Sequence, residues 1–443
     1  MGGLFVVNLG CKVNRVESDS ILAMARSADW VADDMSDASS IVVNTCTVTG
    51  EAQKKTRKAI RQALRANENA QVIATGCAAA IDADELRALD PRVIIVPKQQ
   101  LEDYVAALVP RDSEPVDHAR LAANGADDVD DRFRASDSDS PTQDDAVAYQ
   151  LRVGERFRTR VGIKVQDGCA HACTYCIVHT ARGPVWSKPS SEVVDEAKRY
   201  VAAGVHELVF AGINLGSYRD GDTGITDLVR SVLDATNAFD YRGIPLMRVR
   251  LSSIEPCDID DAFIDLLASS EGRVCRHLHI PVQSGSSKVL REMARPYDAD
   301  RFVDLVMRLR ARVPEISIST DIIVGFPGES DDDFAQTLDL ARTCAFSKIH
   351  VFPYSKRKGT PAAKRTDQID ADTKRRRAEA LRALSDELRH QDANRRIGAE
   401  ELVVVARKGR GLTESYHEVC VDPKVPVGSM VRARLQLGSC VVL

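Results

Sequence analysis

The chain has 443 residues, of which 44% are hydrophobic, so it is long enough for two to four domains and can bury a core. Its net charge of −5 is an average over regions of unlike charge. Its 11 cysteines indicate metal or catalytic sites, because thiols stay reduced in the cytosol, where we expect this chain, and do not form a disulfide framework there. No run approaches the roughly 18 apolar residues that span a bilayer, and Met1 leads directly into LFVVNLG, so we expect a soluble, cytoplasmic protein with no membrane partner.

Residues 1–110 alternate short apolar runs with helical stretches, which predicts a parallel α/β domain. The runs are LFVVNLG, SIVVNTC, QVIATGC and VIIV. Cys11, Cys46 and Cys77 each end or follow one of the first three runs, and the carboxyl ends of parallel strands form the crevice where α/β sheets bind ligands. Alone, the pattern also fits three small buried residues, since free cysteine is often buried. Beside a second set of three, it indicates a metal site.

Residues 111–150 are acidic, poor in large apolar side chains and without periodicity. Such a segment buries too little surface to offset the entropy lost on ordering. We expect a disordered linker between two domains.

Residues 151–396 contain six apolar runs at roughly even spacing, each separated from the next by a helical pattern. Six βα units predict an open, partial TIM-like barrel, followed by a long charged helix at residues 370–395. The runs are GIKVQ, ELVFAG, MRVRLSS, HLHIPV, ISISTDIIVG and KIHVFPY. His277 and His279 share one face of the fourth run, where ordinary packing is favoured over metal binding and where they could also meet a substrate.

The segment after the first of these runs, VQDGCAHACTYCIVHTARG, places Cys169, Cys173 and Cys176 as C-x3-C-x2-C. Three thiolates on one short loop leave one iron of a four-iron cluster open for a substrate. A structural zinc site needs four ligands, and no fourth cysteine or pair-plus-pair spacing follows nearby. Three buried thiols are the remaining alternative. The spacing, the loop position and Tyr175 favour an iron-sulfur cluster, and hence an enzyme.

Polar segments follow four further runs at the strand ends where TIM-type barrels carry their active sites. They are GIN at 212–214, SSIE at 252–255, QSG at 283–285 and DIIVGFPGE at 321–329. Each is a weak signal alone. GFPGES also fits a turn with a helix cap, because Ser330 and Asp333 have the spacing of a capping box, and the two interpretations are compatible.

The C-terminal part is basic, with 20 Lys and Arg against 12 Asp and Glu in residues 345–443. This charge suits a polyanion partner, although a solvated helix face is the alternative. Short strands with Gly and Pro turns at 397–443 predict a small β-barrel. The candidate RNA-binding residues are Lys374, Arg375, Arg376, Arg377, Arg395 and Arg396.

The cysteine loop, with an aromatic residue before its last cysteine, and the six βα units resemble the radical S-adenosylmethionine (SAM) superfamily. The resemblance covers nearly the whole chain. In that superfamily the open iron chelates the amino and carboxylate groups of SAM, and an electron passed through the cluster cleaves the sulfonium to release a 5'-deoxyadenosyl radical. His179 departs from the family, which usually has proline after the last cysteine, and this departure concerns loop rigidity rather than ligation.

The segments GCKVN, VNTCTVT, TGC and CTYC with ARG resemble the methylthiotransferases, which carry a second cluster on such an N-terminal domain. GCKVN with Asn14, Glu17 and Ser18 is most similar to the branch that acts on N6-threonylcarbamoyladenosine at position 37 of tRNA. The branch acting on N6-isopentenyladenosine more often reads GCQMN, and the branch acting on a ribosomal-protein aspartate more often reads GCPKN. The C-terminal barrel is similar to a TRAM domain, an RNA-binding module.

The resemblance implies two [4Fe-4S] clusters, one on each cysteine set, with SAM as both methyl donor and radical source. One SAM would methylate sulfur at the N-terminal cluster, and a second would yield the radical that removes hydrogen from carbon 2 of adenine. The methylthio group would then replace that hydrogen. The implied partners are tRNA and an electron donor such as a flavodoxin or ferredoxin.

The resemblance also assigns the SAM pocket. Gly212 and Asn214 would lie near the methionyl amine, and Ser253 and Glu255 near the ribose. Gly325 would lie beside the adenine. The other expected cofactor-binding residues are Tyr175, Gln283 and Asp321.

Two alternatives remain. The first keeps the chemistry and changes the substrate to isopentenyladenosine or a ribosomal protein. The second is a non-catalytic iron-sulfur RNA-binding protein that senses redox state, which has no need of polar residues at successive strand ends.

Overall fold

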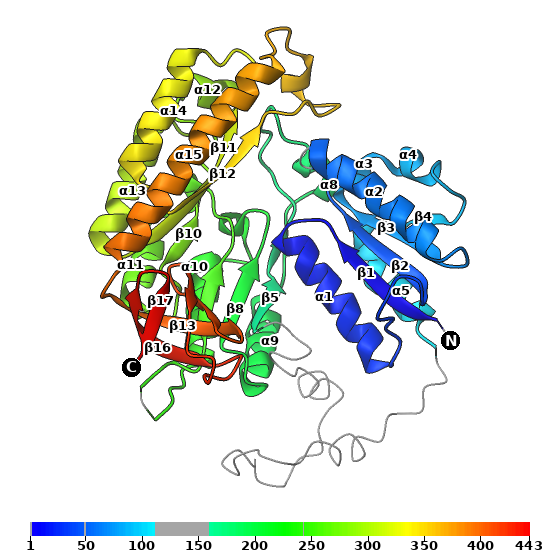
Figure 1. The fold of residues 1–443 in the computed structure, drawn as a ribbon, viewed down its shortest axis with the longest axis horizontal. Helices are drawn as coiled ribbons and strands as arrows, with labels where there is room; N and C mark the ends of the chain where they lie inside the picture. The colour runs from blue at the N-terminus through cyan, green and yellow to red at the C-terminus, as the bar shows by residue number, and fades with distance from the viewer. Residues whose placement is uncertain (1, 48–49, 111–158, 242) are drawn as a thin grey trace.

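The structure is a computed structural model that describes residues 2–47, 50–110, 159–241 and 243–443. Along the chain it forms an N-terminal α/β sheet, a six-stranded partial barrel wrapped by helices, and a small closed C-terminal barrel (Figure 1). The α/β fold class predicted from the sequence is confirmed. The predicted linker at 111–150 lies outside the described residues. Among the described helices, none has the length and apolar character needed to cross a membrane.

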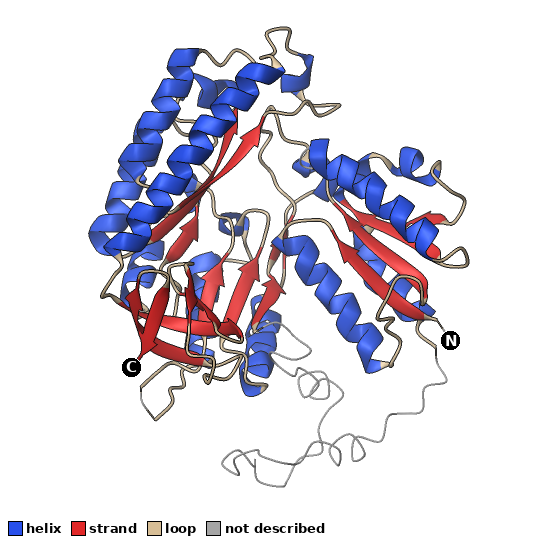
Figure 2. Ribbon diagram, viewed as in Figure 1, coloured by secondary structure: helices blue, strands red, loops and turns tan. Residues whose placement is uncertain are grey.

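The N-terminal sheet has four parallel strands in chain order, one for each predicted apolar run. The strands are β1 (Gly3–Asn8), β2 (Ala38–Thr45), β3 (Gln71–Gly76) and β4 (Val93–Ile95). The helices are α1 (Lys12–Ser27), α2 (Gly50–Ala66), α3 (Cys77–Ile81), α4 (Ala83–Arg87) and α5 (Leu101–Leu108). Ile41 and Val43 pack with α2, whereas Val42 packs with α1 and α5, so helices cover both faces (Figure 2). Burial on both faces explains the nearly continuous apolar runs.

The barrel has the six strands that the sequence predicts. They are β5 (Arg160–Lys164), β8 (Glu207–Ala211), β9 (Arg248–Leu251), β10 (His277–His279), β11 (Ser317–Val324) and β12 (Lys348–Pro353). β5-β8-β9 and β10-β11-β12 pair in parallel, and bridges from Val249 to Val274 and from Ser253 to His279 join the two halves. In the described part of the chain β12 does not pair with β5, so the barrel is open on one side.

Helices cover the outside of this barrel, and their buried apolar side chains form one core with the strands. The longer ones are α9 (Ser190–Ala202), α10 (Ile225–Ala235), α11 (Asp261–Ser269), α13 (Ala299–Arg312), α14 (Asp331–Cys344) and α15 (Ala371–Arg395). The shorter ones near the strand ends are α8 (Val178–Arg182) and α12 (Ser287–Glu292). Ser330 and Asp333 form the predicted capping box at the start of α14.

The N-terminal unit contacts both rims of the barrel opening. On the β5 side, α1 packs so closely that a side chain at Gly162 would meet Val16 at 2.3 Å. On the β12 side, the Arg357 guanidinium donates a hydrogen bond to the Gln53 side chain of α2 at 2.9 Å. These contacts bring the carboxyl ends of the N-terminal strands toward the barrel (Figure 1).

The C-terminal unit is a closed barrel with the strand order β13-β14-β15-β17-β16, consistent with the TRAM-like fold expected from the sequence. Its strands are β13 (Glu400–Arg407), β14 (Arg410–Thr413), β15 (Glu418–Cys420), β16 (Met430–Gln436) and β17 (Ser439–Val442). It docks at the amino ends of the larger barrel's strands, where Arg248 donates to the carbonyls of Leu402 and Leu412, and Arg250 to those of Thr413 and Glu414.

Candidate active site

The loop that carries Cys169, Cys173 and Cys176 follows β5 and ends in α8, which contains His179. Backbone N–H groups of His171 and Val178 donate to the Sγ atoms of Cys169 and Cys176, each at 3.4 Å. Burial raises the pKa of the Cys169 thiol and raises that of Cys176 to about 12. A metal centre must therefore displace their protons, and the N–H donors then face thiolates.

Arg295 links this loop to the predicted SAM pocket, and sequence reasoning missed it. Its guanidinium donates to Cys173 Sγ at 3.1 Å, to the Tyr297 hydroxyl at 2.9 Å and to the Glu255 carboxylate. Burial raises the pKa of Glu255, against the opposing effect of Arg295. A buried cation beside three thiols suits a centre that gathers negative charge, which supports the fit of an iron-sulfur cluster here.

Gln166, a second residue that the sequence did not single out, fixes the neighbouring loops. Its side-chain oxygen accepts from the N–H groups of Ile213 and Asn214 at 2.8 and 3.0 Å. Its amide donates to the carbonyls of Asp167 and Gly168, each at 2.9 Å, so one buried side chain ties the cysteine loop to the segment after β8.

Asn214 also orders its surroundings. Its side-chain oxygen accepts from the N–H groups of Gly216 and Glu255, and its amide donates to Ser217 and Asp258. These four bonds use the capacity of the amide, so Asn214 shapes the predicted pocket through its neighbours.

The other predicted SAM-pocket residues lie on the cysteine loop, within β11 and just after the four strands β8, β9, β10 and β11. Tyr175 packs against the same buried cluster as Ile323, which lies near the end of β11. Gln283 has a left-handed φ of 70°, a strained conformation typical of functional sites. Gly325 lies against α15, because an added Cβ would meet Lys374 at 2.3 Å, and Asp321 pairs with His279 at 3.3 Å. Gly212 follows β8, and Ser253 follows β9.

Gly168 lies at the start of the cysteine loop, where only glycine fits. Its φ is +74°, and a Cβ there would lie 1.9 Å from the Pro184 carbonyl oxygen. We expect Gly168→Ala to lose most of the iron held by this loop, because the backbone at Gly168 or Pro184 must move to make room for the Cβ and would displace the cysteines. The measurement is iron per chain after anaerobic reconstitution, in a background with Cys11, Cys46 and Cys77 changed to Ala.

Gly183→Ala is the matched control. Gly183 has a φ of +77°, but a Cβ there would meet nothing within 4 Å. The substitution carries only the backbone strain, of about 1–3 kcal/mol, and should retain the iron. Equal iron content in the two variants would contradict the steric argument.

The second cysteine set lies at the carboxyl ends of three adjacent strands of the N-terminal sheet. Cys11 is the N-cap residue of α1, Cys46 follows β2, and Cys77 is the first residue of α3. Burial raises the pKa of Cys77, and the charges of Cys11 and Cys46 act in the same direction. The three thiols therefore lie close enough to interact, as the strand-end argument predicts.

A group of side chains inside the barrel brings three potential metal ligands together. Across the described residues, the one group of three or more potential ligands whose ligand atoms all lie within 4.8 Å of one another is His279, Asp321 and His350.

Arg182 joins the second cysteine set to the barrel. This guanidinium, from α8, is 3% exposed and contacts Glu17 at 3.2 Å, Asp167 at 3.0 Å and the Asn14 side chain. One of its nitrogens lies 4.0 Å from Cys11 Sγ. Burial alone would lower its pKa, but Cys77 and the two carboxylates outweigh it, so the pKa is raised and the charge is held. The cation sits where thiolates of the second set would need one.

The basic residues proposed for RNA binding divide into two groups. Arg377 is buried against Glu329 at 2.6 Å, and Arg396 is buried against Asp392 and Glu401, each at 3.1 Å. These two stabilise the packing of α15 and are not surface candidates. Arg375 and Arg376 are exposed. Lys374 lies over the Tyr354 ring, and Arg395 pairs with Asp392.

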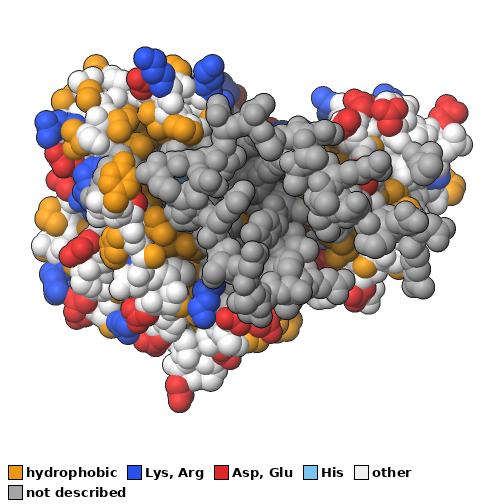
Figure 3. Space-filling view, turned by 90° about the horizontal axis from the view of Figure 1, so that it is seen from below, with side chains coloured by type: hydrophobic (Ala, Val, Ile, Leu, Met, Phe, Trp, Pro, Cys, Tyr) orange, Lys and Arg blue, Asp and Glu red, His pale blue; other side chains and the backbone are white. Residues whose placement is uncertain are grey.

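The face seen from below carries both charge signs. Lys and Arg alternate there with Asp and Glu, and hydrophobic side chains gather on the half of the view that holds the barrel (Figure 3). The described part of this face therefore shows no uniformly basic surface.

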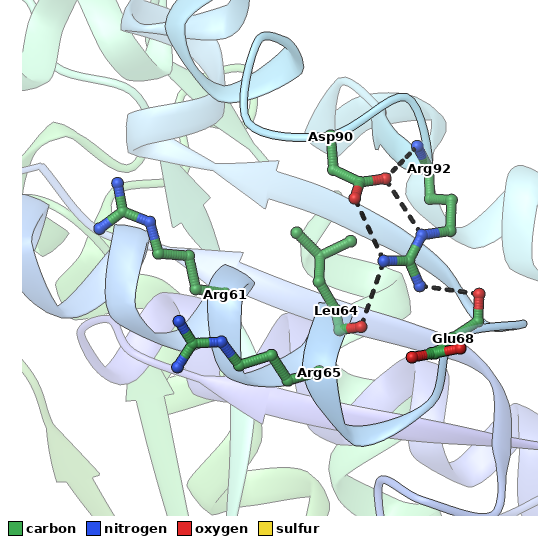
Figure 4. Close-up of a pocket in the computed structure, with 6 residues that line it drawn as sticks. All are labelled: Arg61, Leu64, Arg65, Glu68, Asp90 and Arg92. Carbon is green, nitrogen blue, oxygen red and sulfur yellow. Dashed lines mark hydrogen bonds and ion pairs between the residues drawn. The ribbon is translucent and has the colours of Figure 1, made fainter.

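An arginine-rich pocket in the N-terminal unit is separate from the cysteines. It lies between the end of α2 and the start of β4, at the amino ends of the strands, whereas the cysteines lie at their carboxyl ends (Figure 4). Arg92 uses its guanidinium to bind Asp90 and the carbonyls of Leu64 and Glu68. Its role is to terminate α2, and we assign it none in the chemistry.

Comparison with known proteins places both cysteine sets in matched families. Residues 163–341 match the radical SAM superfamily, and residues 4–97 match the uncharacterized protein family UPF0004. The threonylcarbamoyladenosine tRNA methylthiotransferase MtaB of Bacillus subtilis is 36% identical, over 87% of this chain and 81% of that protein. The tRNA-2-methylthio-N(6)-dimethylallyladenosine synthase of Sphingopyxis alaskensis is 31% identical, over 97% and 94%.

A solved structure supports the fold. The radical SAM methyltransferase TsrM of Kitasatospora setae superposes with a TM-score of 0.51 at 17% identity, covering 82% of this chain and 75% of that one. At this identity the likeness concerns the fold alone.

Proposed function

We propose that this chain, which belongs to the radical SAM methylthiotransferases that modify tRNA, acts on N6-threonylcarbamoyladenosine at position 37. Its product would be the 2-methylthio derivative. The observation that carries the proposal is the convergence of two cysteine sets on one interface, with Arg182 between them. The MtaB relatives favour this substrate, and the dimethylallyladenosine synthases provide the second candidate.

We infer that each cysteine set holds one [4Fe-4S] cluster. With both clusters and SAM bound, the site would supply one-electron cleavage of SAM and a sulfur atom to be methylated and transferred. The chain's own residues hold and orient these groups. His171, Val178 and Arg295 donate to the sulfurs of one set, and Arg182 places a positive charge beside the other. The electron would come from a donor such as a flavodoxin or ferredoxin.

The surroundings of the Cys169 loop favour radical chemistry because they limit water. Cys173 is 5% exposed, and apolar side chains of Val289, Met293, Phe326 and Tyr354 form a buried cluster against which Tyr175 packs. A reactive intermediate in such a place is kept from solvent and from exposed protein. We expect the enzyme to act in the cytoplasm, where tRNA is found.

The substrate is tested by mass spectrometry of tRNA nucleosides from a strain lacking the gene. The proposal expects loss of 2-methylthio-N6-threonylcarbamoyladenosine, with its precursor accumulating. Loss of the isopentenyl derivative would favour the second candidate, and unchanged methylthio nucleosides would leave a ribosomal protein as the target to examine.

The clusters are tested by iron and sulfide determination on anaerobically reconstituted protein. We expect about eight irons in the parent and about four after either cysteine set is changed to Ala. Reduced parent protein should release 5'-deoxyadenosine from SAM. A redox sensor without catalysis would bind the same iron and release none.

A further inference from the structure

The inner face of the barrel carries excess positive charge near the amino ends of its strands. Arg160, Glu207 and Arg248 are register partners on β5, β8 and β9, so their side chains share this face. Glu207 pairs with Arg248 at 2.6 Å, with Arg250 at 2.7 Å and with Arg160 at 3.9 Å. One carboxylate thus faces three guanidinium groups, which favours an anion nearby.

Tyr416 of the C-terminal unit connects this face to the N-terminal unit. Its ring stacks on His277 with centroids 4.6 Å apart, and the Arg250 guanidinium lies 4.8 Å from its centroid. The Lys12 ammonium, from the first residue of α1, lies 5.6 Å from the same centroid. Lys12 therefore extends from the residue beside Cys11 toward the inside of the barrel.

Among the described residues no carboxylate lies within 4.0 Å of the Lys12 ammonium, which lies over the Tyr416 ring instead. The first turn of α1 contains no acidic residue, so the positive end of the helix is not neutralised either. Glu207, the carboxylate whose charge acts on Lys12, is already engaged by Arg248 at 2.6 Å and by Arg250 at 2.7 Å. A cation in this position has capacity for an external anion.

We propose that Lys12 binds the carboxylate of the threonylcarbamoyl group on the modified adenosine and so selects that substrate. The inference rests on the proposed function. Carbon 2 of adenine must approach the cysteine set that includes Cys11, and the N6 substituent projects from the same ring beyond N1. The Lys12 side chain starts one residue from Cys11 and spans a distance comparable to that from carbon 2 of the adenine to the carboxylate of the N6 substituent. An isopentenyl group has no charge and would leave the ammonium without a partner.

The test compares binding of anticodon stem-loop RNAs that carry threonylcarbamoyladenosine, isopentenyladenosine or unmodified adenosine at position 37. Reconstituted full-length protein is used anaerobically, without SAM, with fluorescence anisotropy as the readout. The parent should prefer the threonylcarbamoyl RNA by about 10-fold or more, as a charge-assisted hydrogen bond provides. Lys12→Gln should abolish the preference and leave affinity for unmodified RNA within about twofold, and Lys12→Arg should restore part of it.

Lys58→Gln is the matched control, because it removes one exposed lysine charge from α2 of the same unit. It should leave the preference intact. Iron content and thermal unfolding of both variants report whether the fold and the Cys11 site survive. If Lys12→Gln weakens all three RNAs alike, Lys12 contacts a phosphate and the inference is overturned, as it is if the preference persists. If the parent shows no preference, the proposed substrate falls as well.

Discussion

Replacement of Arg182 by Met is expected to lower methylthiotransfer by about 100-fold or more, because small displacements of reacting groups have effects of that size. Arg182 binds Glu17 and Asn14 of the N-terminal unit and Asp167 of the barrel, so its loss loosens the contact that sets one cysteine set against the other. Formation of 5'-deoxyadenosine should fall less, since Arg295 and the Cys169 loop remain. The measurement is the ratio of methylthio product to 5'-deoxyadenosine.

The same substitution should lower the free energy of unfolding by about 3 kcal/mol, measured by chemical denaturation. This value is the lower end of the loss in stability expected when a buried ion pair is broken. The loss is small because both carboxylates keep a cation, Lys164 at 3.2 Å from Glu17 and Lys98 at 2.6 Å from Asp167. Arg182→Lys keeps the charge but loses the planar fork, so an intermediate effect is expected.

Arg230→Met provides the control for the loss of an arginine in an exposed pair. Arg230 and Asp227 are each about half exposed, so the substitution should change the free energy of unfolding by no more than about 0.5 kcal/mol. If Arg182→Met also stayed within that range and left the product ratio unchanged, Arg182 would have no part in aligning the two sites.

The strands and the convergence of Cys11, Cys46 and Cys77 could be predicted from local patterns. Apolar runs bounded by helical stretches indicate parallel strands, and in such a sheet residues that end neighbouring strands meet at one edge. In the structure β1 pairs in parallel with β2, and β2 pairs in parallel with β3, so the three strand ends lie side by side. The prediction needed no knowledge of side-chain geometry.

Arg182, Arg295 and Gln166 could not be found in this way. Arg182 meets Asn14 across 168 residues, and Arg295 meets Cys173 across 122 residues. Such partners depend on how separate units dock, which no periodicity records. ARG after the last cysteine was a visible motif, but nothing in it indicated which acceptors the guanidinium would reach.

The error in the basic run had a visible signal. Arg377 shares the buried stripe of α15 with Leu381, Leu384 and Leu388, spaced as one face of a helix. A run of four basic residues therefore divides between faces, and the one on the apolar stripe needs an internal carboxylate. Glu329 supplies it here.

Glu207→Gln is expected to lower the free energy of unfolding by about 3–5 kcal/mol, measured by chemical denaturation. The substitution keeps the shape of the side chain but leaves Arg248 and Arg250 buried without their carboxylate. Those two guanidinium groups also bind backbone carbonyls of the C-terminal barrel, so limited proteolysis should release that barrel more readily. Glu418→Gln, which affects an exposed pair with Arg407, should stay within about 0.5 kcal/mol.

Acid titration separates the charge of Glu207 from its packing. Burial alone would raise the pKa of this carboxyl, but Arg250 and Arg248 outweigh it and hold the pKa well below its usual value of 4.5. A carboxyl with a depressed folded pKa adds stability above its unfolded pKa and loses it as the pH falls toward the folded value. The difference in unfolding free energy between parent and Glu207→Gln should therefore be full at neutral pH and shrink below about pH 4.5. A difference that stayed constant down to strongly acidic pH would show that hydrogen-bond geometry, and not charge, makes Glu207 necessary.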